Sequence, residues 1–175
     1  MNNLPKTDKF KPLKILMAPN PKLRRVCVPV SHQNSFIQIE RLIELMKKTM
    51  KFYNALGLAA PQIGVNFRVI VVNHPDGPIG MINPEIIKTD GEIELEEGCL
   101  SFLRESAFIK RSKKIEVKYL DERGDEKVQT AEDLFAVCIQ HEIDHLDGIL
   151  FVDRMSNIKK DMVLKKFKKR GKFSS

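Results

Sequence analysis

The sequence H-E-I-D-H at 141–145 constrains the fold and the chemistry of this chain more than any other feature. Residues four positions apart lie one turn apart on the same face of a helix, so both imidazoles can reach one metal ion. Glu142 then lies beside the ion, where it can take a proton from water and pass it on. Three earlier residues share this helical face and predict that it is buried: Leu134, Val137 and Cys138. We expect the helix to begin with Thr130 as its N-cap and to end at Gly148.

A metal ion held by two histidines needs a third protein ligand. The extended pattern H-E-x-x-H-x-x-G-x-x-H would place a third histidine at position 151, where this chain has Phe151. Cys99 is the strongest candidate, because the adjacent Gly98 permits close approach of the backbone and a metal stabilises a thiolate. The sequence leaves four weaker candidates open: Asp153, Asp161, His32 and His74.

Composition predicts a protein with one main domain. The chain has 175 residues, of which 42% are hydrophobic, and this is enough to build an apolar core. It contains no apolar run of the roughly 20 residues that a membrane span requires, and its first residues lack the apolar core of a secretory signal. Three widely spaced cysteines argue against a disulfide framework and for a reducing compartment. We expect a soluble intracellular domain over residues 1–155, with a loose N-terminal arm over 1–12.

The formal net charge of +7 is confined to the C-terminal end of the chain. Residues 156–175 contain eight Lys or Arg and a single acidic residue, Asp161, whereas the remaining residues carry equal numbers of basic and acidic side chains. A basic protein often binds nucleic acid, but a neutral body does not support that interpretation for the main domain. Residues 156–175 are therefore expected to form a separate basic helix or tail, helical from 157 to about 170.

The rest of the hydrophobic pattern predicts an α+β fold. Apolar residues recur at helical spacing from 36 to 53 and indicate an amphipathic N-terminal helix. A buried strand is expected at 68–73, extended chain at 81–83, and two strands joined by a turn at 115–119 and around 127–129. This order favours antiparallel or mixed strands around a central helix that bears the H-E-x-x-H motif, rather than alternating β-α-β units.

Three short motifs, in this order, resemble those of the peptide deformylases: G-L-A-A-P-Q at 57–62, E-G-C-L-S at 97–101 and Q-H-E-I-D-H-L at 140–146. The three together are highly specific for that family, and the resemblance extends from about Leu13 through Val152. It implies a metal-dependent hydrolase that removes the formyl group from the N-terminal formylmethionine of newly made polypeptides and releases formate.

The resemblance also implies a role for several motif residues. One divalent metal ion would have three protein ligands, with water as the nucleophile in the fourth position: Cys99, His141 and His145. Glu142 would be the general acid/base. Gln62 and the backbone N–H of Leu100 would donate hydrogen bonds to the formyl oxygen as it becomes tetrahedral. Asp144 is expected to orient a neighbouring side chain rather than to act in catalysis.

The substrate site follows from the same resemblance. Gly57 would hydrogen-bond the substrate through its backbone. The pocket for the methionine side chain would be lined by four residues that are apolar or nearly so: Leu56, Leu134, Val137 and Cys138. The family usually has glycine where this chain has Ala55 and proline where it has Leu103, and many members have arginine where it has Ser106. The change at Ala55 matters only if the backbone there needs a positive φ. The changes at Leu103 and Ser106 concern the rate and the grip on residues beyond methionine rather than the metal ligands.

Cofactor, partners and location are expectations from the resemblance as well. Iron(II) is the expected metal in the cell, and zinc, nickel or cobalt also suit two imidazoles and one thiolate. N-formylmethionyl nascent peptides are the expected substrates, and no membrane partner is expected. The protein is expected to be a monomer in the cytoplasm, with an organelle as the alternative location. The basic segment 156–175 is expected to contact the ribosome.

Two other functions fit parts of the pattern. A metallopeptidase would share the H-E-x-x-H motif, but its usual third ligands are absent, since no Glu follows Glu142 and Phe151 takes the place of a third histidine. An RNA-binding protein would use the basic segment 156–175 and hold the metal for structure alone. A structural zinc site is closed by four protein ligands, however, and this sequence offers three good ones, so the open position favours catalysis.

Overall fold

The computed structural model describes residues 10–31, 36–102 and 105–171. Most of the expected N-terminal arm, the weaker ligand candidate His32, the departure at Leu103 and the last four residues therefore lie outside the described residues. The described chain contains three α-helices, seven strands and three short 3-10 helices. It has the predicted α+β class, with strands that pair only in the antiparallel sense.

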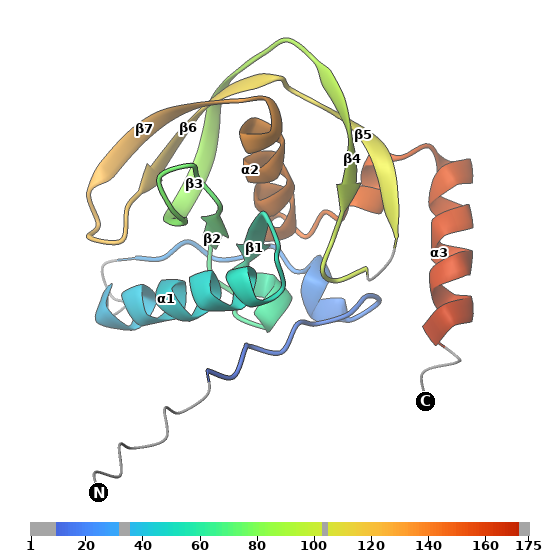
Figure 1. The fold of residues 1–175 in the computed structure, drawn as a ribbon, viewed down its shortest axis with the longest axis horizontal. Helices are drawn as coiled ribbons and strands as arrows, with labels where there is room; N and C mark the ends of the chain where they lie inside the picture. Colours follow the sequence, from blue (N-terminus) through green and yellow to red (C-terminus); the bar gives the residue numbers. More distant parts are fainter. Residues whose placement is uncertain (1–9, 32–35, 103–104, 172–175) are drawn as a thin grey trace, which may run out of the picture.

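The strands form two sheets. The larger sheet has the order β1-β2-β3-β6-β7, with bounds Gly57–Ala59, Val69–Val72, Ile79–Asp90, Lys114–Leu120 and Glu126–Glu132 respectively. The smaller sheet is a hairpin of β4 (Ile93–Gly98) and β5 (Ser106–Arg111). The helices are α1 (Phe36–Phe52), α2 (Asp133–Leu146) and α3 (Asn157–Gly171). Figure 1 shows α2 standing between the two sheets, with α1 below the strands and α3 at one side.

Strand β2 is buried along its whole length, which explains its unbroken sequence of valine and isoleucine. Ile70 and Val72 belong to a core cluster that includes residues of α2, whereas Val69 and Val71 belong to a second cluster with α1. The predicted apolar stripe of α1 supplies four buried residues to that second cluster: Ile39, Ile43, Met46 and Met50. The two helices thus pack on opposite faces of the same strand.

Strand β3 continues past Pro84, where the sequence predicts an end to the extended chain. Proline has no N–H to donate to a ladder, and β3 accommodates it through a register shift against β6 between Ile82 and Glu85. The predicted pairing of β6 with β7 is confirmed, although β7 is longer than expected. Strands β4 and β5 are not among the predicted strands, even though the alternation I-E-L-E at 93–96 is a strand signal.

Helix α2 begins later than predicted. Thr130 is not its N-cap, because this residue lies in β7 and pairs with Glu116 of β6. The helix instead begins at Asp133, after the extended residue Glu132, whose side chain makes no capping bond. Pairing with a neighbouring strand therefore overrides the local capping pattern. At the other end, Gly148 has φ +70° just after the C-cap residue, as predicted for a glycine that ends a helix.

Helix α3 confirms the predicted C-terminal helix and packs against the rest of the chain. Three of its residues lie on a third core cluster that contains Phe102 and Phe151: Val163, Leu164 and Phe167. The ring centroids of Phe102 and Phe167 are 5.2 Å apart. The helix therefore contacts the loop that follows β4, while a domain boundary after residue 155 stays a prediction. No helix in the described part of the chain has the length and apolar character needed to cross a membrane.

Candidate active site

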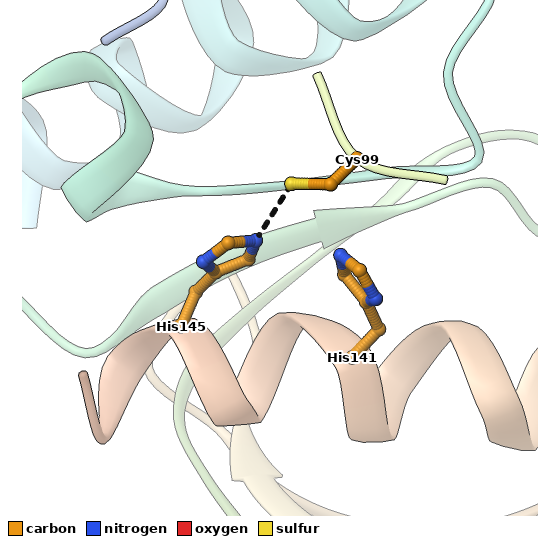
Figure 2. Close-up of side chains that lie close together, drawn as sticks. All are labelled: Cys99, His141 and His145. Carbon is orange, nitrogen blue, oxygen red and sulfur yellow. Dashed lines mark hydrogen bonds between the residues drawn. The ribbon is translucent and has the colours of Figure 1, made fainter. Parts of the chain in front are cut away.

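Three side chains that can ligate a metal converge between α2 and the loop after β4. Cys99 directly follows β4, and His141 and His145 project from successive turns of α2 on the side that faces Cys99, as Figure 2 shows. One ligand atom from each residue lies within 4.8 Å of the other two. The Sγ of Cys99 is 3.3 Å from Nε2 of His145. Within the described ranges, no other three residues of these types come together in this way.

The two imidazoles favour the ionised form of Cys99. Burial of the thiol opposes ionisation, but the attraction of His145 and hydrogen bonds from both imidazoles outweigh it and hold the pKa of Cys99 well below its usual 9.0. The thiolate is the form of cysteine that binds metals. One thiolate and two imidazoles suit zinc, iron(II), nickel or cobalt. The donor set therefore fits a divalent transition metal.

Glu97, at the end of β4, engages His141 on the other side of its ring. Glu97 Oε2 lies 2.7 Å from His141 Nδ1, which leaves Nε2 of the imidazole for a ligand. Arg111, at the end of β5, donates to both oxygens of this carboxylate, from Nε over 2.7 Å and from Nη2 over 3.0 Å. Burial would raise the pKa of Glu97, but the hydrogen bonds from His141 and Arg111 outweigh it and lower the pKa to about 2. The carboxylate therefore stays charged and orients the imidazole.

The carboxyl group of Glu142 is almost removed from solvent. The residue is 4% exposed, and its Oε2 is buried with no hydrogen-bond partner in the described structure. This burial raises the pKa of Glu142 to about 7, against the attraction of His141 and His145. Gly57 of β1 lies directly against the carboxyl group, since a Cβ at Gly57 would be 2.4 Å from Glu142 Oε1. A carboxyl group with a pKa near neutrality can both accept and return a proton.

Gln62 is held with its NH₂ group toward the metal-ligating side chains. It lies in the 3-10 helix Ala60–Ile63, and its Oε1 accepts a hydrogen bond of 2.7 Å from the backbone N–H of Ala59. The Nε2 atom then lies 3.6 Å from Cys99 Sγ and 3.5 Å from Ser101 Oγ. The side chain is 2% exposed, so the amide is fixed in one orientation by buried partners.

A cavity of about 480 Å³ joins these groups. It is lined by all but one of the predicted site residues: Leu56, Gly57, Gln62, Cys99, Leu100, Leu134, Val137, Cys138, His141 and Glu142. The exception is His145, which is 1% exposed. Burial raises the pKa of Cys138 well above its usual value, so this thiol stays neutral and adds to the apolar wall. The structure thus brings the candidate polar groups and the candidate apolar residues to the wall of one cavity.

The weaker ligand candidates lie away from this cavity or outside the described residues. The carboxylate of Asp153 is engaged by Arg24 and Lys160. Asp161 is exposed on α3, and His74 lies in the connection between β2 and β3. None of the three is available as a third ligand beside the two histidines of α2.

Two of the three departures from the family pattern can be located. The backbone at Ala55 is not left-handed, and the neighbour Asn54, at φ +52°, makes the turn instead. A glycine is therefore not required at position 55. Ser106 lines the cavity, and its hydroxyl donates a 2.6 Å hydrogen bond to Glu96 Oε1. The serine consequently brings no positive charge to the place where many family members have arginine.

Sequence reasoning missed the roles of Glu97 and Arg111. The position of Glu97 inside the E-G-C-L-S motif was a usable signal. Nothing local marks Arg111, which the β4–β5 register places opposite Ile93 and whose side chain reaches Glu97. Asp144 accepts a 2.5 Å hydrogen bond from Arg111 Nη1 and a further pair from Arg154, so it can orient both side chains; that it takes no part in catalysis stays a prediction.

Comparison with known proteins gives a consistent result. The model of the family described as polypeptide deformylase matches residues 12–161. The peptide deformylase of Hydrogenovibrio crunogenus is 45% identical over 160 residues, which cover 90% of this chain and 94% of that protein. That of Pseudoalteromonas translucida is 39% identical over 165 residues, with 93% and 98% covered. The crystal structure of a peptide deformylase from Legionella pneumophila is similar with a TM-score of 0.85 and 40% identity, over 93% of this chain and 97% of that one. The chain therefore belongs to the polypeptide deformylase family, hydrolases that remove formyl groups.

Proposed function

We propose that this enzyme hydrolyses the formyl amide of N-formylmethionine at the start of newly made polypeptides, with one divalent metal ion held by Cys99, His141 and His145. The observation that carries the proposal is the convergence of these three side chains at a cavity that also contains the buried carboxyl group of Glu142. Family membership supports the same reaction.

Three features favour a metal at this position. The ligand atoms lie within 4.8 Å of one another, the thiol of Cys99 ionises readily, and Glu97 orients the imidazole of His141. When bound, a divalent ion would supply Lewis-acid chemistry, polarising water and the formyl oxygen. We propose iron(II) as the metal in the cell, with zinc, nickel or cobalt able to replace it.

The chain itself would move the proton and stabilise the developing negative charge. Glu142 would accept a proton from the attacking water and deliver it to the leaving amine, a role that its pKa of about 7 suits. The NH₂ group of Gln62 and the backbone N–H of Leu100 would donate to the formyl oxygen as it becomes tetrahedral. Donors of this kind are often worth roughly 3–4 kcal/mol each.

The substrate chain would bind between β1 and the end of β4. Strand β1 is an edge of the larger sheet, so the backbone of Gly57 can pair with an extended peptide on its free side. Four residues that line the cavity would form the pocket for the methionine side chain: Leu56, Leu134, Val137 and Cys138. An apolar pocket with a neutral thiol suits an unbranched thioether.

Formate release tests the proposal directly. The protein is purified without oxygen, loaded with iron(II) or nickel, and given formyl-Met-Ala-Ser; absence of formate from the metal-loaded protein would refute the reaction. Glu142→Ala should retain the metal and lose nearly all turnover, whereas Cys99→Ala should lose the metal. Full activity of Glu142→Ala would show that another group moves the proton.

We also propose that the enzyme works on nascent chains in the cytoplasm, as a monomer that contacts the ribosome through α3. The support is the basic sequence of residues 156–175 and the exposure of Ile158 and Met162 on α3. Ribosome binding through phosphate contacts should weaken as salt increases. Deletion of 157–175 should weaken this binding and leave hydrolysis of a short peptide intact; unchanged binding would refute the proposed role.

A further inference from the structure

A chain of four polar side chains leads from His141 toward the surface. Glu97 contacts His141 Nδ1 and accepts two hydrogen bonds from Arg111. Arg111 turns its remaining amino group, Nη1, to Asp144 at 2.5 Å. Asp144 also accepts two hydrogen bonds from Arg154, one of them from Nε over 3.0 Å. Four elements are thereby joined: β4, β5, α2 and the 3-10 helix Phe151–Arg154, which precedes α3.

Three of these charges are buried and depend on one another. The side chains of Arg111, Glu97 and Asp144 are 4%, 5% and 8% exposed. Together they carry one negative charge too many, because a single guanidinium serves two carboxylates. Arg154, whose side chain is 45% exposed, supplies the missing positive charge from the surface end. Burying unbalanced charge is costly, so the positive charge of Arg154 stabilises these three buried side chains.

The hydrogen bonds that Arg154 makes to Asp144 determine how firmly Arg111 holds Glu97. With Arg154 in place, Asp144 is paired twice, and Arg111 can direct two of its three contacts to Glu97. Without Arg154, the attraction of Asp144 falls on Arg111 alone and draws the guanidinium away from Glu97. Glu97 would then hold the imidazole of His141 less firmly.

We infer that Arg154 is a positioning residue for the metal ligand His141, acting through Asp144, Arg111 and Glu97. This inference rests on the metal centre in the proposed function. The chain of contacts ends at the wall of a second cavity, of about 620 Å³, which Arg111, Asp144 and Arg154 all line. Arg154, at the outer end of this chain of contacts, therefore lies outside the lining of the cavity that contains Glu142, and its substitution does not alter the residues that line the substrate site.

The test is the release of cobalt(II) from the loaded full-length protein to a coloured chelator. Loss of a residue that orients a metal ligand typically costs 10–100-fold in affinity or activity, and Arg154 acts through two further links, so Arg154→Ala should release cobalt about three- to tenfold faster. The visible absorption band of bound cobalt(II), which reports ligand geometry, should shift. Arg154→Lys restores the charge with a single donor and should recover part of both effects.

Arg24→Ala is the matched control. The Arg24 side chain is 44% exposed and pairs with Asp153, the neighbour of Arg154 in the same 3-10 helix, and among the described residues its side-chain hydrogen bonds go to Asp153 and Gly148, outside the path to Glu97. It should therefore leave the cobalt band and the release rate unchanged. In an Asp144→Asn background, Arg154→Ala should have no further effect, because the link through which it acts is already broken.

The outcomes separate this inference from the function on which it rests. If the wild-type protein does not hold one equivalent of cobalt(II), the metal centre itself is refuted. If the wild type holds it and Arg154→Ala behaves as Arg24→Ala does, only the role of Arg154 is refuted. Equal effects of Arg154→Ala with and without Asp144→Asn would also overturn it. Should Arg154→Ala or the Asp144→Asn variants not fold, the comparison of Arg154→Lys with Arg24→Ala decides.

Discussion

Gly57→Ala probes the contact between β1 and the carboxyl group of Glu142. A Cβ at Gly57 would lie 2.4 Å from Oε1, 2.7 Å from Cγ and 2.8 Å from Cδ of Glu142. Contacts below 3.0 Å are not tolerated, and ordinary contact begins at 3.4 Å, so the carboxyl group must retreat by about 1 Å. The carboxyl group can retreat only away from β1, toward the cavity that Glu142 lines, and this moves it from the position that the wild type holds.

The size of the effect follows from that displacement. Misplacing a catalytic group by about 1 Å can cost roughly 100-fold in rate. We therefore expect kcat/KM for a formyl-Met peptide to fall about 100-fold, equivalent to about 2.7 kcal/mol of transition-state stabilisation. Metal content should not change, because the three atoms nearest to the new Cβ all belong to Glu142 and not to a metal ligand.

The assay is formate release at several concentrations of formyl-Met-Ala-Ser, with the metal content of each sample measured. Gly80→Ala is the matched control, since a Cβ there would lie 2.5 Å from Cγ2 of the buried Ile43, and neither Gly80 nor Ile43 lines the cavity that contains Glu142. This control should lose about 1–3 kcal/mol of stability through overpacking, with kcat/KM per metal-loaded molecule unchanged.

The variant Glu142→Asp tests whether displacement of the carboxyl group causes this loss of activity. Aspartate at position 142 is shorter by one methylene and withdraws the carboxyl group from the new methyl. Gly57→Ala should therefore cost much less in a Glu142→Asp background than in the wild type. Wild-type kcat/KM for Gly57→Ala, or an equal loss in both backgrounds, would refute steric displacement of Glu142.

Three further predictions concern the pocket, acid stability and α3. Val137→Phe should fill the apolar wall of the cavity and raise KM for formyl-Met peptides about tenfold, with a smaller effect on kcat; an unchanged KM in steady-state assays would place the methionine elsewhere. Burial would raise the pKa of Asp153, but Arg24 and Lys160 lower it from 3.8 to about 2, so its contribution to the free energy of unfolding is complete above about pH 4 and is lost as the pH falls toward 2. Urea denaturation should accordingly show a shallower loss of stability over this range for Asp153→Asn, and parallel curves would contradict the assignment. Phe167→Ala should lower the free energy of unfolding by about 1–2 kcal/mol, because it removes the ring packed on Phe102; no change in the urea midpoint would show that α3 does not dock there.

The sequence predicted those elements whose signal is local. The helical spacing at 36–53 and the apolar run V-I-V-V inside the strand expected at 68–73 each indicate burial from a few neighbouring residues, and the structure confirms α1 and β2 there. Thr130 had the local signal of an N-cap, but its backbone pairs with Glu116 of a neighbouring strand. Such pairing depends on residues that are distant in the chain, and a local capping pattern cannot reveal it.

By itself, the sequence determined which residue types stand together on α2, because a spacing of four residues places His141 and His145 on one face of any helix. The three family motifs indicated the other candidate site residues, Cys99, Gln62 and Gly57 among them. Spacing alone does not bring these residues to the two histidines. That was decided by tertiary structure, through the pairing of β4 with β5, the edge position of β1 and the core packed around α2. The same packing decided the path from His141 to Arg154. Contacts between distant residues arise from sheet pairing and from the burial of a shared core, and neither leaves a periodic signal in the sequence.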